Sequence, residues 1–265
     1  MMKNILYTAI NAALEAGKVT LEIYYEGNDF DIELKDRDNS PVTKADKASH
    51  NVILSYLSET KIPILSEESK NIAYKERKDW KQLWIVDPID GTKEFIKRNG
   101  EFTVNIALIE NQKPTLGVIF VPAKGLLYFS SIDLGAFKVD VNLKLYNVES
   151  LIDRARKIIR KGDNDIFTVV VSKSHLTKKT QKYIKKIKNK HIEINLISIG
   201  SSLKFCLMAE GAANCYPRFA PTMEWDTAAG QAICEHSGLI VLDWNTKQPI
   251  LYNKKKLVNN FFLVQ

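Results

Sequence analysis

The sequence predicts a mixed α+β fold in which a half built on an antiparallel sheet is followed by an α/β half. Apolar residues recur at helical spacing over residues 2–25, which predicts a long amphipathic helix. Residues 102–121 show two strand patterns around a polar turn at 111–113, as an antiparallel hairpin does. After about residue 145, strand and helix patterns alternate. No linker composition separates the halves, so 1–144 and 145–265 are expected to form one unit of residues 1–265.

Shorter elements complete the first half. Residues 30–35 alternate as a strand does, and Pro41 to Asp46 is expected to open a second helix, with Asp46 as a first-turn acid. Residues 62–65 predict a short buried strand that ends in Ser66-Glu67-Glu68-Ser69. Further strands are predicted over residues 102–110, 115–121, 125–130 and 136–139.

The most informative stretch is residues 84–92, Trp-Ile-Val-Asp-Pro-Ile-Asp-Gly-Thr. Its apolar start predicts a buried strand over 83–86, and the following Asp-Pro-Ile-Asp-Gly-Thr predicts a turn before a short helix over 93–97. Asp87 and Asp90 therefore lie where the strand stops. Pro88 stiffens the loop between them, and Gly91 permits an unusual backbone angle or the close approach of a ligand.

Two carboxylates held this close repel each other, and one tends to stay protonated. A hard divalent cation removes that repulsion, and Mg²⁺ accepts carboxylates together with phosphate oxygens. The amides of Gly91, Thr92 and Lys93 would then face a phosphate at a helix N-terminus. A plain surface turn is the alternative, because Asp, Pro and Gly are common turn formers. Glu67 and Glu68 supply further carboxylates at the end of another strand, which favours the metal interpretation.

The second half carries polar residues at the ends of its predicted elements. A strand over 167–171 precedes Ser-Lys-Ser-His at 172–175, and a basic helix covers 177–189. A strand over 192–199 ends at Gly-Ser-Ser, and a helix follows over 203–211. A strand over 214–217 and a polar stretch over 221–226 lead to a helix over 227–234, which ends at Gly238 as a C′ residue. Asp226 could serve there as an N-cap.

Composition and charge limit the class of protein. The chain has 265 residues, of which 45% are hydrophobic and 26% charged, an ordinary globular balance. A net charge of +7 favours anionic partners, but the lysines at 178–190 and 254–256 lack interleaved aromatics and are interpreted as solvated faces. Three cysteines without CxxC spacing indicate buried thiols rather than a disulfide or zinc framework.

No apolar run is long enough to span a bilayer, and no signal peptide precedes the first helix. We therefore expect a cytoplasmic protein without an integral membrane segment. Peripheral association with the cytoplasmic face of the inner membrane is the alternative. The sequence leaves open whether the protein is a monomer or a homodimer.

The order of three motifs resembles the inositol monophosphatase superfamily of Mg²⁺-dependent, Li⁺-sensitive phosphatases. The motifs are Glu67-Glu68 after a strand, Trp-x-Val-Asp-Pro-x-Asp-Gly-Thr at 84–92, and Trp-Asp-x-Ala-Ala-Gly at 225–230. Four further motifs, at 91–102, 172–175, 201–206 and 216–219, resemble the bacterial 3′(2′),5′-bisphosphate nucleotidases. The resemblance runs over nearly the whole chain and implies the layered αβαβα fold of that superfamily.

The resemblance also implies a metal and phosphate site with two, or possibly three, Mg²⁺ ions. Glu67, Asp87 and the backbone carbonyl of Ile89 would hold one ion, and a weaker third ion would share Glu67. Asp87, Asp90 and Asp226 would hold the second ion. Gly91 and Thr92 would bind the scissile phosphate beside these ligands. Asp46 and Thr92 would together take a proton from the attacking water, with a structural first-turn acid as the alternative for Asp46.

A second phosphate on the substrate would be bound by the second half of the chain. Lys204 and Arg218 suit such an anion, and Arg218 offers a planar fork of donors. His175 and Ser201 would hydrogen-bond the sugar, base or phosphate. The alternatives are a solvated helix residue for Lys204 and a polar residue at a strand end for His175.

The expected reaction is hydrolysis of the 3′-phosphate of 3′-phosphoadenosine 5′-phosphate to AMP and phosphate, in sulfur assimilation and nucleotide salvage. The 5′-phosphosulfate analogue is an expected second substrate. An inositol or sugar phosphatase of the same superfamily is the alternative. A non-enzymatic basic module that binds RNA or an anionic membrane is a third reading, and the ordered acidic motifs argue against it. We expect a small-molecule partner and no nucleic acid.

Overall fold

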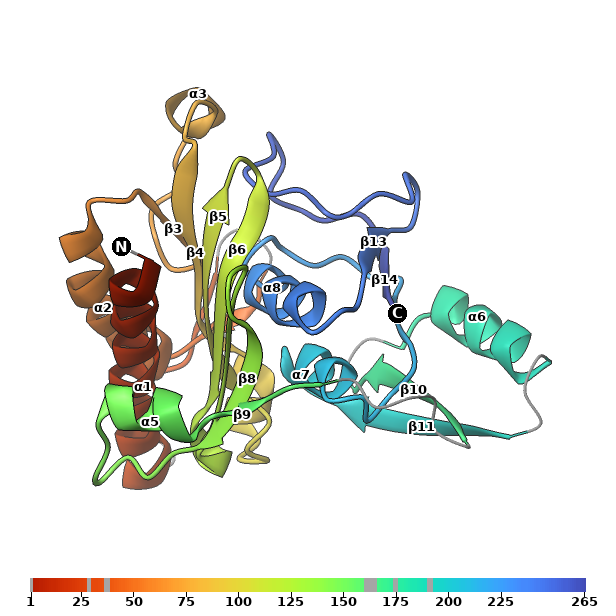
Figure 1. The fold of residues 1–265 in the computed structure, drawn as a ribbon, viewed down its shortest axis with the longest axis horizontal. Coiled ribbons are helices and arrows are strands. Elements are labelled where there is room, and N and C mark those ends of the chain that lie inside the picture. Colours follow the sequence, from red (N-terminus) through yellow and green to blue (C-terminus); the bar gives the residue numbers. More distant parts are fainter. Residues whose placement is uncertain (1, 28–29, 36–38, 160–165, 174–175, 190–192) are drawn as a thin grey trace.

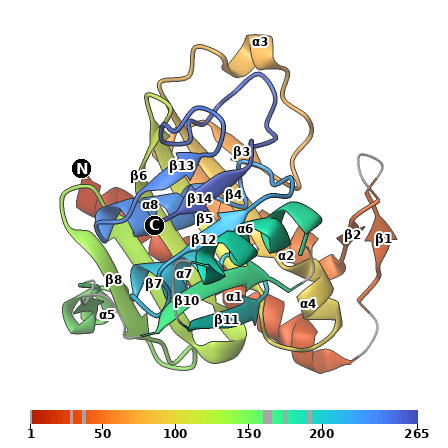
Figure 2. The ribbon, with the colours of Figure 1, turned by 90° about the vertical axis from the view of Figure 1, so that its right-hand side faces the viewer.

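Helices and sheets alternate in layers along the longest axis of the molecule (Figure 1). The computed structural model describes residues 2–27, 30–35, 39–159, 166–173, 176–189 and 193–265. Helices α1 and α2 cover one face of a large sheet, and α7 and α8 lie on its other face. Beyond them lie two smaller sheets, with α6 on the outside (Figures 1 and 2). The predicted layered fold is confirmed.

The central sheet has seven strands in the order β3-β4-β5-β6-β7-β8-β9. Strands β3 and β4 run parallel, and every other neighbouring pair is antiparallel. The predicted antiparallel hairpin is therefore confirmed. The strands span β3 Ile64–Ser66, β4 Gln82–Asp90, β5 Thr103–Glu110, β6 Lys113–Val121, β7 Leu126–Ser131, β8 Gly135–Asp140 and β9 Arg156–Lys157.

The first helical layer consists of α1 Met2–Glu26, α2 Lys44–Leu57 and α5 Val148–Arg154. Leu6, Ile10 and Leu14 lie on the predicted apolar stripe of α1 and are buried in the core that this layer shares with the sheet. Each such side chain removed from water stabilises the fold by about 1.5–3 kcal/mol. The short 3₁₀ turns at Ser58–Thr60 and Pro122–Lys124 follow α2 and β6.

Two sequence predictions near α2 are wrong. Helix α2 begins at Lys44 rather than at Pro41, because Thr43 and Asp46 form a capping box that starts the helix there. Pro41–Val42 is instead a strand, β2, which pairs with β1, Glu33–Leu34. The predicted strand over 30–35 is limited to Glu33–Leu34. The β1–β2 hairpin projects beside α4, Thr92–Ile96 (Figure 2).

The second helical layer packs α8, Ala228–His236, directly on β5 and β6. Gly117 of β6 permits this contact, because a Cβ there would lie 2.6 Å from the Ala229 carbonyl oxygen. Helix α7, Leu203–Ala209, packs against α8. Gly238 follows α8 with a φ of +95°, so it is the C′ glycine that the sequence predicts. The three cysteines are buried free thiols, as predicted.

The outer layer is only partly the predicted α/β arrangement. Strands β10 Phe167–Ser172 and β11 Ile194–Ile199 form a parallel pair around α6, Lys178–Lys188, as expected. The other sheet is antiparallel, in the order β12-β14-β13, with strands Tyr216–Arg218, Phe262–Val264 and Val241–Asp243. The final strand, β14, pairs between β12 and β13. The alternation of strands and helices along the sequence does not predict this order. Every lysine of α6 is exposed, which confirms a solvated face there. The same prediction is wrong for Lys254, which is half-buried and pairs with the buried Glu224 at 2.7 Å.

Strand β4 continues beyond its predicted end. It was expected to stop at Val86, but its pairing with β5 resumes at Asp90 after a register shift between Asp87 and Asp90. This irregularity brings both carboxylates to the end of the strand. The loop from Glu67 back to β4 carries α3, Tyr74–Arg77. None of the described helices combines the length and apolarity that crossing a bilayer requires.

Candidate active site

Four predicted carboxylates from three segments line one cavity of about 400 Å³. Strands β3 and β4 are parallel, and the Glu67 amide donates to the Val86 carbonyl at 3.1 Å, so Glu67 and Asp87 emerge side by side. Asp90 lies opposite Thr103 at the far end of β4. Asp226 comes from the turn before α8, which packs on β5 and β6.

The carboxylates are close enough to raise one another's pKa. Burial, followed by the charges of Glu67, Asp90 and Asp226, raises the pKa of Asp87 well above its usual range. Burial, followed by the charges of Asp90 and Glu67, raises the pKa of Asp226 to about 8. Burial, opposed by the charge of Lys204, raises the pKa of Asp90 to about 6. The cavity therefore holds acidic groups that cannot all ionise together unless a cation offsets their mutual repulsion.

Lys35 supplies one positive charge to this cavity and was not predicted from the sequence. Its Nζ donates to Glu67 Oε1 at 2.8 Å and also to Glu68. Although burial alone would lower it, the charges of Glu67 and Glu68 raise the pKa of Lys35 above its usual value. Glu68 is thus an ion-pair partner of Lys35. A lone lysine 32 residues before Glu67 carries no local signal of this contact.

The donor set fits a hard divalent cation. The candidate donors are carboxylate oxygens of the buried Asp87 and the partly buried Glu67, Asp90 and Asp226, and Ile89 also lines the cavity. Such oxygen donors suit Mg²⁺. Within the described part of the chain, no three His, Cys, Asp or Glu side chains form a group that could hold a metal ion as they stand. Lys35 Nζ occupies a position beside the Glu67 carboxylate that a bound cation would compete for.

Asp46 and Thr92 contact each other, as predicted. Thr92 Oγ1 lies 3.2 Å from Asp46 Oδ1 and 3.3 Å from the Ile89 carbonyl oxygen. Asp46 Oδ2 accepts hydrogen bonds from the Thr43 amide at 2.7 Å and the Thr43 hydroxyl at 2.6 Å. Burial, opposed by these hydrogen bonds, raises the pKa of Asp46 to about 6. Thr92 lines the cavity and Asp46 is buried behind it, so Asp46 reaches a ligand through Thr92.

Gly91 has the unusual backbone angle that its position between Asp90 and Thr92 suggested. Its φ is +93°, and it precedes the first residue of α4. A Cβ there would lie 3.0 Å from the Glu101 carbonyl oxygen and 3.3 Å from the Ser201 Cβ. A side chain at residue 91 would therefore be strained and would crowd the cavity next to Thr92.

Ser201, Lys204 and Arg218 line the same cavity, as predicted. Lys204 is buried, so its interpretation as a solvated helix residue is wrong. Its Nζ donates to the Ser201 carbonyl, and burial, opposed by the charge of Asp90, lowers the pKa of Lys204 to about 8. Arg218 donates from Nη2 to the Pro221 carbonyl at 3.3 Å, while its buried Nε has no hydrogen-bond partner among the described residues. His175 lies outside the described residues.

Two supporting residues were missed in the sequence. Glu94 lines the cavity although it is only 7% exposed, and its charge acts on both Lys204 and Asp90. Ser202 Oγ lies 2.7 Å from Thr103 Oγ1 and 2.7 Å from Asn105 Oδ1, which joins the start of α7 to β5. Both residues lie within motifs quoted above, but only the fold assigns them contacts.

Cation binding at this site is expected to release protons. Burial and mutual repulsion raise the pKa of Asp226 to about 8 and that of Asp90 to about 6. In the metal-free protein at pH 7, most Asp226 carboxyls and a minority of Asp90 carboxyls are therefore protonated. Affinity for Mg²⁺ should therefore rise between pH 6 and pH 8. Calorimetry in buffers of different ionisation enthalpy measures the released protons directly. Asp226→Asn should release fewer, and an affinity independent of pH with no proton release would contradict the prediction.

The same pKa values predict how the metal-free protein responds to pH. A carboxylate with a higher pKa in the folded state than in the unfolded state favours folding only while it is protonated. This contribution to the free energy of unfolding is lost as pH rises from the unfolded-state pKa, about 4, through the folded-state pKa. The metal-free protein should accordingly become less stable toward pH 8. Added Mg²⁺ should raise Tm more at pH 8 than at pH 6.

A family model and several known proteins match most of the chain. A family model described as the inositol monophosphatase family matches residues 1–261. The 3′(2′),5′-bisphosphate nucleotidase CysQ of Shigella flexneri is 43% identical over 246 residues, 92% of this chain and 92% of that protein. CysQ of Salmonella typhimurium is 42% identical over 254 residues, 95% of this chain and 96% of that protein.

Solved structures agree with these sequence matches. The crystal structure of CysQ from Bacteroides thetaiotaomicron, described as a bacterial member of the inositol monophosphatase family, superposes with a TM-score of 0.90 at 47% identity, covering 99% of this chain and 97% of that one. An IMPase from Thermotoga maritima shares the fold with a TM-score of 0.75 at 20% identity, covering 97% of this chain and 89% of that one. The resemblance stated from the motifs is confirmed.

Proposed function

The chain belongs to the inositol monophosphatase family, and from this premise we infer that it is a 3′(2′),5′-bisphosphate nucleotidase. It hydrolyses the 3′-phosphate of 3′-phosphoadenosine 5′-phosphate to AMP and phosphate, and we extend the proposal to the 5′-phosphosulfate analogue. The curated relatives that share this activity in their names align over most of both chains. They favour this function over the inositol or sugar phosphatase alternative.

One observation carries the proposal: a single cavity combines an acidic cluster with buried cationic side chains. Glu67, Asp87, Asp90 and Asp226 provide the acidic cluster, and Lys204 and Arg218 provide the cations. A nucleotide with two phosphate groups matches this division, since one phosphate would need a cation to offset its repulsion by the carboxylates and the other is an anion for the basic side chains. An inositol monophosphate offers no second phosphate to Lys204 and Arg218.

We propose that the cation is Mg²⁺, bound as two or possibly three ions, and that Glu67, Asp87, Asp90, Asp226 and the Ile89 carbonyl would hold these ions. When bound, the divalent cation neutralises phosphate charge and activates the attacking water. The proposal is supported by the hard oxygen donors of the cavity and by the burial and mutual repulsion that disfavour the ionised carboxylates in the absence of a cation.

The remaining steps belong to the side chains. Gly91 and Thr92 bind the scissile phosphate at the end of β4, where Gly91 leaves the space that a Cβ would fill. Asp46, with its pKa raised to about 6 by burial, is mostly ionised at neutral pH and accepts the proton of the Thr92 hydroxyl. Thr92 can in turn accept a proton from the attacking water. Lys204 and Arg218 hold the second phosphate, which fixes the orientation of the reacting one.

Phosphate release from a panel of monoesters tests this function. The panel is 3′-phosphoadenosine 5′-phosphate, its phosphosulfate analogue, 5′-AMP and inositol 1-phosphate, each with Mg²⁺, with Mg²⁺ and Li⁺, or with EDTA. We expect kcat/KM to favour the bisphosphate over inositol 1-phosphate by about 100-fold. Inositol 1-phosphate would leave the buried Lys204 and Arg218 without an anionic partner, and a substrate that leaves buried polar groups unpaired is strongly disfavoured. EDTA should abolish release and Li⁺ should inhibit it. Equal turnover of inositol 1-phosphate would overturn the substrate, and no release from any monoester would overturn the phosphatase.

A further inference from the structure

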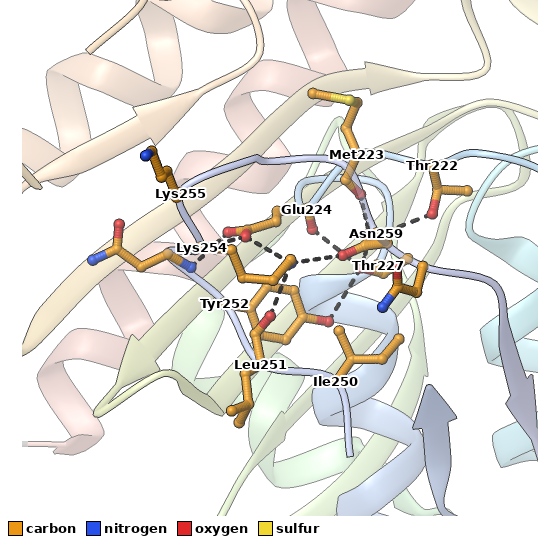
Figure 3. A network of polar contacts seen from close by, with 12 residues as sticks. Thr222, Met223, Glu224, Thr227, Ile250, Leu251, Tyr252, Lys254, Lys255 and Asn259 are labelled. Atoms are coloured by element: carbon orange, nitrogen blue, oxygen red, sulfur yellow. Dashed lines mark hydrogen bonds and ion pairs between the residues drawn. The ribbon is translucent and has the colours of Figure 1, made fainter. Parts of the chain in front are cut away.

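A buried carboxylate two residues before Asp226 is the centre of a polar network that the proposed reaction does not use (Figure 3). Glu224 is fully buried. Its Oε2 accepts from the Asn253 amide at 2.7 Å, and its Oε1 accepts from the Lys254 amide at 3.0 Å and the Lys254 Nζ at 2.7 Å. Glu224 thus binds the start of the segment 253–259, which we call the C-terminal strap.

The other end of the C-terminal strap binds the turn on both sides of Glu224. The Asn259 Nδ2 lies 2.8 Å from the Met223 carbonyl oxygen and 3.0 Å from Thr227 Oγ1. The Asn259 amide donates to the Thr222 carbonyl at 2.8 Å. Lys254 Nζ also donates to Asn259 Oδ1 at 3.0 Å, which closes the network. The whole turn from Thr222 to Thr227 is therefore held against one short segment.

The orientation of Asp226 depends on this turn. Asp226 Oδ2 accepts a hydrogen bond from the Met223 amide at 2.8 Å, and the Met223 carbonyl is in turn held by Asn259. The next amides of the chain, those of Thr227 and Ala228, donate to the Glu224 carbonyl at 3.2 Å and 3.0 Å. A displacement of Met223 or Glu224 would consequently rotate the Asp226 carboxylate.

The C-terminal strap also holds the loop that begins at Glu67. Arg77 of α3 is 2% exposed, and its Nη1 donates to Asn253 Oδ1 at 2.8 Å and to the Lys254 carbonyl at 2.8 Å. The Asn253 Nδ2 donates back to the Arg77 carbonyl at 2.7 Å. The loop carrying Arg77 runs from Glu67 to β4, and β4 carries Asp87 and Asp90. One segment therefore contacts both acid-bearing parts of the chain.

We propose that Glu224, Asn253 and Arg77 are positioning residues that couple the Glu67 loop to the Asp226 turn through the C-terminal strap. A buried network whose members are mutually bonded holds its parts rigidly. It thereby sets the distance between carboxylates that have to share a cation and that otherwise repel each other. The inference rests on the proposed metal site. It predicts that residues without contact to a cation control how tightly the cation binds.

Mn²⁺ binding measured by electron paramagnetic resonance of the free ion, without substrate, tests this coupling. Arg77→Met and Glu224→Gln should each raise the Kd for Mn²⁺ by about 10- to 100-fold, as losses of ligand-orienting partners do. The double variant should raise it little further than the stronger single variant, because both act through one segment. Lys255→Gln, an exposed side chain of the same strap, should bind Mn²⁺ like the wild type.

Further measurements separate positioning from general loss of structure. Binding is recorded well below each variant's Tm, and circular dichroism confirms the fold. Asn253→Gly, which keeps the positive φ of residue 253, replaces Glu224→Gln if that variant does not fold. At saturating Mg²⁺, KM for the bisphosphate should stay within about twofold of the wild type. A lowered Tm with an unchanged Kd, or fully additive effects, would overturn the coupling. Absent Mn²⁺ binding by the wild type would instead refute the metal site.

Discussion

Asp87→Asn is expected to lower kcat/KM for 3′-phosphoadenosine 5′-phosphate by about 10³- to 10⁴-fold, since a metal ligand contributes several kcal/mol and each 1.36 kcal/mol is tenfold. Asp87 is buried, and it interacts with Glu67, Asp90 and Asp226. The amide removes a charged ligand but keeps the shape of the side chain. It also removes repulsion, so the variant without metal should melt at a higher temperature than the metal-free wild type at pH 8.

The matched control for this variant is Asp133→Asn, which changes an exposed carboxylate that does not line the cavity. It should keep wild-type activity, and Mg²⁺ should still raise its Tm. Steady-state kinetics and melting curves in EDTA and in Mg²⁺ give both readings for each variant. Activity of Asp87→Asn within tenfold of the wild type, or an unchanged Mg²⁺ effect on its Tm, would contradict the role of Asp87.

Arg218→Met is expected to lower kcat/KM for the bisphosphate by about 100-fold but that for 3′-AMP by less than about tenfold. Arg218 is buried in the cavity wall, and its Nε has no hydrogen-bond partner within the described part of the structure. An anion would satisfy this group. A hydrogen bond to a charged group contributes about 1.5–3 kcal/mol, so the loss of one or two accounts for the effect on the bisphosphate. Because 3′-AMP lacks the 5′-phosphate, its kcat/KM should change little when Arg218 is replaced.

Kinetics of each variant on both nucleotides show whether Arg218 binds the second phosphate or only supports the fold. Arg218→Lys keeps the positive charge but loses the planar fork, so it should fall between the wild type and Arg218→Met on the bisphosphate. Lys113→Met, at an exposed position of β6, is the control for loss of a positive charge. Equal losses on 3′-AMP and the bisphosphate would show that Arg218 supports the fold rather than the second phosphate.

Local patterns in the sequence predict much of this arrangement, and the motif resemblance adds Asp226 to the carboxylates that line the cavity. The apolar stripe of α1 and the β5–β6 hairpin follow from periodicity, because burial on one face repeats with the geometry of the element. Asp87 and Asp90 were identified by the change from an apolar run to a turn. The structure moves the end of β4 from Val86 to Asp90, since a register shift lets the strand continue through a proline.

Contacts between distant side chains could not be predicted in the same way. Lys35 contacts Glu67 and Glu68 at the end of β1, and the alternation over 30–35 predicts a strand there but not the distant loop that Lys35 meets. The link between Glu224 and the C-terminal strap spans about 30 residues and depends on how the last segment of the chain returns. Propensity and spacing report local structure, whereas these pairs form only when the layers are assembled.

Anomalous diffraction from a crystal grown with Mn²⁺ tests the central claim most directly, because it locates the metal without reference to activity. The account predicts at least one anomalous peak in the cavity, within bonding distance of carboxylate oxygens from Asp87 and from at least one of Glu67, Asp90 and Asp226. Lys35 should then have released Glu67. Peaks confined to other surfaces, or an empty cavity at saturating Mn²⁺, would contradict it.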